Sequence, residues 1–196
     1  MRALREHRLR RAWRQLEREP LRQPEGPQRW GADARVLVLF DRDDAGQSRA
    51  AHALTLADFG IGGRGRERPP SLLGYASAPE PDATVASGTW TPKQLAYAGM
   101  ARADVAEGVL AKAYDLIVNL VPRAFPPFDF LCAAARAHLR AASHDEAMHA
   151  YDIVIRPRAS TTASRPAPSS AGASATAAFL QELRAYLGAL NPHDHG

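Results

Sequence analysis

The chain has 196 residues, 45% hydrophobic and 23% charged, which is typical of one folded α/β domain with short appendages and excludes two ordinary domains. Its net charge of +4 is concentrated at one end, because residues 1–30 hold nine Arg and four Glu and the remainder sums to −1. No apolar run approaches the roughly 20 residues that span a bilayer, and no secretory signal is recognisable. We therefore expect a cytoplasmic protein without an integral membrane segment.

Residues 1–30 are predicted to form a basic amphipathic helix and its connector. Leu9, Trp13 and Leu16 recur at helical spacing, and Pro20 is expected to end the helix. The cationic side chains of this segment are Arg2, Arg5, Arg8, Arg10, Arg11, Arg14 and Arg18. Such a surface suits RNA, the ribosome or an anionic membrane surface, and the apolar stripe equally suits simple packing on the domain.

The first half of residues 31–156 is predicted to start an α/β domain. Residues 36–40 form a continuous apolar run, as expected of a strand buried on both faces of a parallel sheet, and residues 47–58 are predicted as the following helix. Residues 71–75 are a second strand candidate and residues 76–88 a loop. Residues 91–94 read as a helix start with a capping box.

The second half of the domain continues the alternation. A helix is predicted near residues 104–113, a strand over 114–121 ("YDLIVNLV") and a helix over 128–138 ("FDFLCAAARAH"). A weak strand near 138–141 and a last strand at 151–155 ("YDIVI") follow. Strands alternating with helices predict a three-layer α/β sandwich with a mostly parallel sheet.

The C-terminal part is predicted to be a linker followed by one more helix. Residues 157–176 are rich in Ser, Thr, Ala and Pro and are expected to be disordered. Residues 177–190 are predicted to form a helix that docks back on the domain, and residues 191–196 a tail. The expected apolar face of this helix consists of Phe179, Leu183, Tyr186, Leu187 and Leu190.

The acidic turn after the first strand offers a candidate ligand or metal site. It resembles the second acidic motif of the Toprim domain of primases and topoisomerases, in which carboxylates hold Mg2+, with Asp41, Asp43, Ala45 and Gly46 at matching positions. A Toprim site also needs a glutamate after an earlier strand, and none is predicted. We expect Asp44 and its neighbours to cap the helix. Magnesium-dependent phosphoryl transfer or nucleotide binding at Asp41, Asp43, Asp44 and Gly46 is the alternative.

Three further patterns are interpreted as structural. Gly60-x-Gly62-x-x-Gly65 matches the dinucleotide fingerprint in spacing, but no strand precedes it and no helix follows it, so we expect a helix end and a loop. The His and acid clusters at residues 144–149 and 193–195 are expected to be solvated loop and tail. Cys132, the single cysteine, is expected to pack as a small hydrophobe.

The motifs "VLVLFDRDD", "LLGYA", "WTPKQLAYAG", "YDLIVNL", "FDFLCAAARAHLRAAS", "YDIVI" and "FLQELRAYLGAL" occur in this order from residue 35 onward. Together they resemble a family of small bacterial proteins known only as a domain of unknown function. The segment "YDLIVNL" with its helix is also similar to the N-terminal Rossmann-like domain of heptosyltransferase-type glycosyltransferases. The resemblance implies a single Rossmann-like domain without that catalysis, because those enzymes need a second domain for the sugar nucleotide.

The sequence therefore predicts a Rossmann-like α/β domain with a basic N-terminal helix, acting as a non-catalytic binding or accessory protein. RNA or the ribosome is the expected partner, bound through the N-terminal arginines and aided by Arg64, Arg66 and Arg68. No cofactor is expected, apart from Mg2+ under the alternative.

Overall fold

The computed structural model describes residues 33–59, 61, 69–78, 88–96, 100–144, 146–156 and 168–190, with positions 11, 14, 18, 21–25 and 28 near the N-terminus. For residues 148 and 168–174 it describes the backbone only. Within these residues, no helix has the length and apolar character needed to cross a bilayer.

The centre of the structure is a sheet of six parallel strands in the order β3-β2-β1-β4-β5-β6. The strands are β1 (Val36–Asp41), β2 (Ser71–Tyr75), β3 (Thr89–Trp90), β4 (Ala113–Asn119), β5 (Arg136–Ala142) and β6 (Ile153–Val154). The chain runs outward from β1 to β3, crosses back to β4 and then runs outward in the other direction. This is the strand order of a doubly wound, Rossmann-like fold, so the predicted fold class is confirmed.

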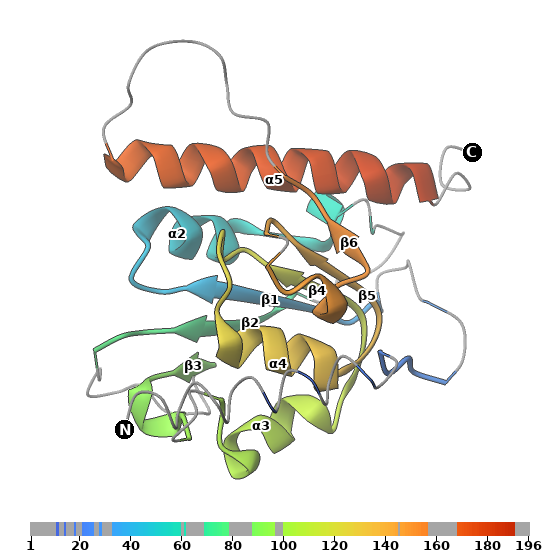
Figure 1. The fold of residues 1–196 in the computed structure, drawn as a ribbon. Coiled ribbons are helices and arrows are strands. Elements are labelled where there is room, and N and C mark those ends of the chain that lie inside the picture. The colour runs from blue at the N-terminus through green and yellow to red at the C-terminus, as the bar shows by residue number, and fades with distance from the viewer. Residues whose placement is uncertain are drawn as a thin grey trace.

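Helices cover both faces of the sheet (Figure 1). The α-helices are α2 (Ala45–Ala53), α3 (Ala103–Leu110), α4 (Pro126–Ala134) and α5 (Pro168–Leu190), and the 3-10 turns are η1 (Leu56–Phe59), η3 (Pro92–Gln94) and η4 (Met148–Ala150). In Figure 1, α2 and α5 lie on one face and α3 and α4 on the other. The result is the predicted three-layer sandwich.

Strand β1 shows why the core has two halves. Val38 and Phe40 pack on the α2 and α5 side, and Leu37 and Leu39 pack on the α3 and α4 side. Because both faces of the strand are buried, its sequence reads as an unbroken apolar run rather than an alternating one. This explains why the strand was predictable.

Several predicted boundaries are wrong. Helix α2 ends at Ala53, and η1 takes up the next part of the predicted helix. The capping box at Thr91 forms, but it opens only the single turn η3, because Leu95 then pairs with Ala101 in an isolated bridge. Helix α4 ends at Ala134 rather than at residue 138, because β5 begins two residues later.

The C-terminal helix differs from the prediction in length and in its buried face. It begins at Pro168, so residues 168–176 are helical rather than linker; alanine is the best helix former, and proline is tolerated in the first turn. Phe179, Leu183 and Leu187 are buried as predicted, whereas Tyr186 and Leu190 are 47% and 50% exposed. The helix therefore docks through a narrower stripe than expected.

Other predictions lie outside the described residues. These include Gly60, Gly62 and Gly65, residues 79–87 of the loop predicted over 76–88, residues 157–167 of the predicted linker and the tail over 191–196. Arg64, Arg66 and Arg68 and most of the N-terminal helix are also outside them.

Candidate functional site

A pocket of about 260 Å3 opens at the carboxyl edge of the sheet. It lies at the ends of β1, β2 and β4, where the strand order reverses and where open α/β sheets bind their ligands. Its lining residues are Asp41, Asp43, Tyr75, Ser77, Val121, Arg123, Phe125 and Phe128. Because ligand pockets usually measure roughly 300 to 1,000 Å3, this one suits a small ligand.

The turn between β1 and α2 brings two of the predicted carboxylates to the pocket. Asp41 Oδ1 accepts the backbone N–H of Asp43 at 2.9 Å, which folds the turn. Asp43 Oδ2 accepts the backbone N–H of Ser77 at 2.7 Å, which ties the turn to the segment after β2. Asp41 and Asp43 thus stand at the pocket wall in fixed positions.

Asp44 and Gly46 serve the helix instead. Asp44 Oδ1 accepts the backbone N–H of Gly46 at 2.8 Å and that of Gln47 at 3.0 Å, so Asp44 is the N-cap of α2. The buried Gln47 side chain in turn accepts the N–H of Asp41 at 3.0 Å. The expected capping role is confirmed for Asp44. The N-terminus of α2 already holds a carboxylate, so it is not open to a ligand phosphate.

This arrangement does not fit a three-carboxylate magnesium site. Asp44 is directed into the helix cap, whereas Asp41 and Asp43 line the pocket. In the part of the chain that the structure describes, no three His, Cys, Asp or Glu side chains lie close enough together to hold a metal ion.

The pocket perturbs its own acidic groups. The pKa of Asp41 is raised, first by burial and then by the charges of Asp43 and Asp44, although hydrogen bonds from the Asp43 and Asp44 backbone oppose the shift. The pKa of Tyr75 is also raised, by burial and by the two carboxylates Asp43 and Asp41. The Tyr75 phenol therefore stays protonated and able to donate at physiological pH.

Aromatic rings form the apolar part of the pocket. The ring centroids of Tyr75 and Phe125 are 4.6 Å apart, and those of Phe125 and Phe128 are 5.0 Å apart in an edge-to-face pair. Val121, Arg123 and Phe125 come from the β4–α4 loop, residues 120–125. These three residues were not predicted as part of a site, because they carry no local motif; their position directly after the carboxyl end of a clear strand is the signal that the sequence offers.

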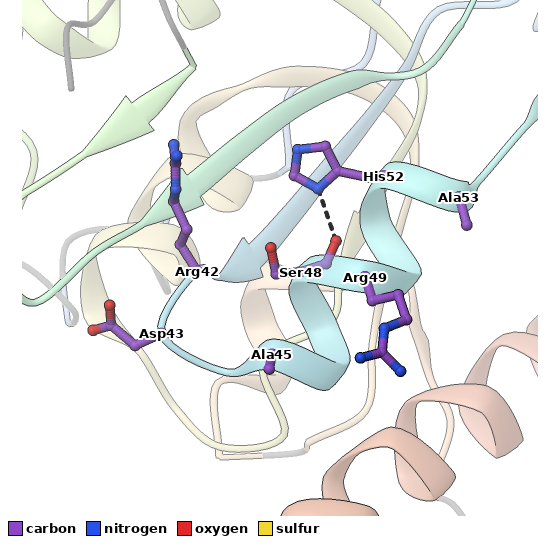
Figure 2. Close-up of a pocket in the computed structure, with 7 residues that line it drawn as sticks. All are labelled: Arg42, Asp43, Ala45, Ser48, Arg49, His52 and Ala53. Carbon is purple, nitrogen blue, oxygen red and sulfur yellow. Dashed lines mark hydrogen bonds between the residues drawn. The ribbon is translucent and has the colours of Figure 1, made fainter. Parts of the chain in front are cut away.

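A second hollow lies alongside the whole length of α2 (Figure 2). Its lining includes Arg42, Ser48, Arg49 and His52. In Figure 2 the Arg49 side chain points away from Ser48 and His52, whereas Arg42 donates to Thr89 Oγ1 at 2.5 Å. His52 Nδ1 lies 2.7 Å from the Ser48 carbonyl oxygen. These side chains do not converge on one point, so they form a polar surface rather than a cradle for a ligand.

The histidine cluster departs from its prediction. His144 is only 4% exposed, and its Nε2 lies 3.4 Å from Oδ1 of the buried Asp129. The segment after β5 folds back over α4, which the polar sequence around His144 does not indicate.

Cys132 is fully buried as predicted, and burial together with the nearby Asp129 raises the pKa of its thiol, which makes the thiol unreactive.

Three of the seven predicted RNA-contacting arginines belong to the described residues. Arg11, Arg14 and Arg18 all have exposed side chains. Arg2, Arg5, Arg8 and Arg10 lie outside the described residues.

Comparison with known proteins finds no matching family, no similar curated protein and no similar solved structure. The function of the pocket therefore has to follow from the chain's own residues.

Proposed function

We propose that the protein binds a small organic molecule in the pocket at the carboxyl ends of β1, β2 and β4. The ligand class that suits the lining is a ring-containing molecule with hydroxyl or amino donors. The observation that carries this proposal is that acidic side chains and aromatic rings line one pocket at the switch point of the sheet.

The polar groups of the pocket are available to such a ligand. Asp41 Oδ1 and Asp43 Oδ2 accept backbone N–H groups, and both carboxylates line the pocket, where carboxylate oxygens can accept further hydrogen bonds. These oxygens suit hydroxyl or ammonium groups, and the Tyr75 and Phe125 rings suit the face of a planar ring or a sugar. Arg123 adds a donor for an anionic substituent.

The same features disfavour the binding of a dinucleotide in this pocket. Rossmann-like domains that bind dinucleotides place the pyrophosphate at the N-terminus of the first helix, and here Asp44 occupies that position. The pocket volume of about 260 Å3 also favours a ligand of nucleoside or monosaccharide size.

Ligand binding by matched variants tests this proposal. Adenosine, glucose and tyramine represent a nucleoside, a monosaccharide and an aromatic amine, and their dissociation constants are measured by calorimetry. For a ligand that binds, Asp41→Asn should weaken binding about 10- to 100-fold, as expected when a charged hydrogen-bond partner is lost. Asp104→Asn, at an exposed carboxylate of α3, should leave binding unchanged. Equal binding by the wild type and Asp41→Asn contradicts the proposal.

A second proposal concerns the N-terminal segment. Its +5 charge and the exposure of Arg11, Arg14 and Arg18 support association with RNA or a ribonucleoprotein such as the ribosome. Such a role agrees with a cytoplasmic location and with the proposed kinship to small bacterial Rossmann-like proteins.

A further inference from the structure

A chain of polar side chains, four of them buried and the last one exposed, connects to the two ends of the β4–α4 loop. Its members, in order of contact, are Asn119, Tyr151, Asp129, His144 and Glu146. We propose that this chain positions the loop and that protonation of His144 tightens its hold. The inference rests on the proposed function, because the loop contributes Arg123 and Phe125 to the ligand pocket.

The first end of the chain holds the loop at Val121. The Asn119 side chain is fully buried, and its Oδ1 accepts the backbone N–H of Val121 at 3.1 Å. Asn119 Nδ2 donates to the Tyr151 hydroxyl at 2.7 Å, and that hydroxyl donates to Asp129 Oδ1 at 2.5 Å. The start of the loop is thus connected to a carboxyl group inside α4.

The second end holds the loop at Ala124. Glu146 Oε2 accepts the backbone N–H of Ala124. The same oxygen lies 3.7 Å from His144 Nδ1, and His144 Nε2 lies 3.4 Å from Asp129 Oδ1. His144 therefore stands between two carboxyl groups that belong to the two ends of one chain, with Arg123 in the loop segment between the anchors.

The contacts of His144 are incomplete. Neither of its ring nitrogens has a hydrogen-bond partner within the described residues, and Asp129 Oδ2 also has none, although all three atoms are buried. A neutral imidazole carries one N–H and one lone pair, so it can donate to only one of the two carboxylates. An imidazolium carries two N–H groups and a positive charge, so it can donate to both.

The groups that contact His144 are two carboxyl groups and one phenol. The described titratable groups with a contact to His144 are Asp129 of α4, Tyr151 and Glu146, and Cys132 lies near Asp129 and Tyr151. Burial raises the pKa of the Cys132 thiol and of the Tyr151 phenol, so both stay neutral at physiological pH. Proton uptake by His144 therefore strengthens its pairing with Asp129 and Glu146, and through Glu146 it fixes the backbone of Ala124.

The coupling between His144 and the loop predicts that the ligand affinity of the pocket depends on pH. Histidine is the side chain that ordinarily changes charge between about pH 5 and 8. When His144 is protonated the loop is held at both anchors, and when it is neutral the Ala124 anchor loses its link to Asp129. A ligand that contacts Arg123 or Phe125 should then bind more tightly at pH 5.5 than at pH 8, and its binding should in turn favour proton uptake.

An NMR titration of the whole protein without any ligand tests the coupling. The amide resonances of Val121 and Ala124 and the ring resonances of His144 are followed from pH 5 to 8.5. We expect the Ala124 amide and the His144 ring to shift with one shared midpoint. In Glu146→Gln, whose exposed side chain can be changed without opening the core, the ring should still titrate and the Ala124 shift should be lost.

The control is His138→Gln on β5, in which the shared titration should persist. The inference is overturned if the Ala124 amide shift does not change with the His144 titration, or if it still changes with that titration in Glu146→Gln. A titrating loop in a protein that binds none of the three probes contradicts the proposed function but supports the loop mechanism, so the two failures are distinguishable.

Discussion

Arg140 is completely buried on β5, and its Nη1 lies 3.1 Å from Oδ2 of Asp152. The other two guanidinium nitrogens also donate: Nε donates to the Cys132 carbonyl at 2.8 Å, and Nη2 donates to the carbonyls of Ala135, at 2.8 Å, and Arg22. One side chain therefore joins the end of α4, the segment before β6 and part of the N-terminal region.

Replacing this arginine should be costly. Arg140→Met removes the charge, leaves buried carbonyl groups without their donors and leaves Asp152 without its guanidinium partner, so we expect a loss of roughly 3 to 5 kcal/mol in the free energy of unfolding. Urea denaturation measures this loss. Arg136→Met, on the same strand but exposed, should cost less than about 1 kcal/mol. Similar losses in both variants would mean that the buried network is not important for stability.

The backbone conformation at position 88 requires glycine. Its φ of +68° is in the left-handed region, and a Cβ at this position would lie 2.5 Å from the Leu72 carbonyl oxygen. Gly88→Ala should therefore destabilise the protein by about 1 to 3 kcal/mol. Gly108→Ala, in α3 where a Cβ meets no atom within 4 Å, should instead stabilise it by about 0.5 to 1 kcal/mol. Thermal unfolding of the pair checks the opposite signs.

Tyr114 should make the protein sensitive to alkali. Burial raises its pKa from 10.0 to about 12, against the opposing charge of Arg35. The unfolded chain loses the phenolic proton near pH 10 while the folded chain keeps it, so the stabilisation is present below pH 10 and is lost as the pH rises toward 12. The loss is roughly 3 kcal/mol. Tyr114→Phe should reduce this dependence in pH-series unfolding, and the exposed Tyr186→Phe should preserve it.

RNA association is tested best in the full-length chain. Leu21 packs against the core and the Arg22 carbonyl accepts the Ala137 N–H, so a deletion of residues 1–30 would also disturb the fold. Binding of a labelled single-stranded RNA is therefore measured for the triple variant in which Arg11, Arg14 and Arg18 become Gln. In a plot of the logarithm of the binding constant against the logarithm of the salt concentration, the slope should become shallower by about 2 in the variant.

The control for this experiment is a triple variant of exposed arginines elsewhere, with Arg49, Arg136 and Arg184 changed to Gln. It should bind RNA as the wild type does. A loss of binding in the control alone would place any RNA contact away from the N-terminal segment, and binding of anionic vesicles without RNA binding would favour a membrane surface instead.

Strands that are buried on both faces were readable from the sequence. The apolar runs over β1 and β4 reflect the two covered faces of the sheet, and they were sufficient to predict the parallel α/β class. Strand β3 has only two residues, Thr89 and Trp90, so it leaves no periodic pattern. The start of α5 was missed because an Ala- and Ser-rich composition is compatible with both a linker and a helix.

The candidate site was only partly readable. Asp41 and Asp43 follow an obvious strand, and their position at its carboxyl end was predictable. Arg123 and Phe125 join them only because β4 lies beside β1, which is a property of the strand order and not of any local pattern. The burial of His144 likewise depends on how the chain returns after β5, so its polar neighbours suggested a solvated loop.

The most direct test of the proposed pocket is to map where a ligand acts. Backbone amide shifts are recorded by NMR as adenosine, glucose or tyramine is added to the wild-type protein. The binding proposal predicts that the largest changes cluster at residues 41–43, 75–77 and 121–125, around the carboxyl edge of the sheet. Changes confined to α5 or to the hollow beside α2, or no change with any of the three probes, would contradict it.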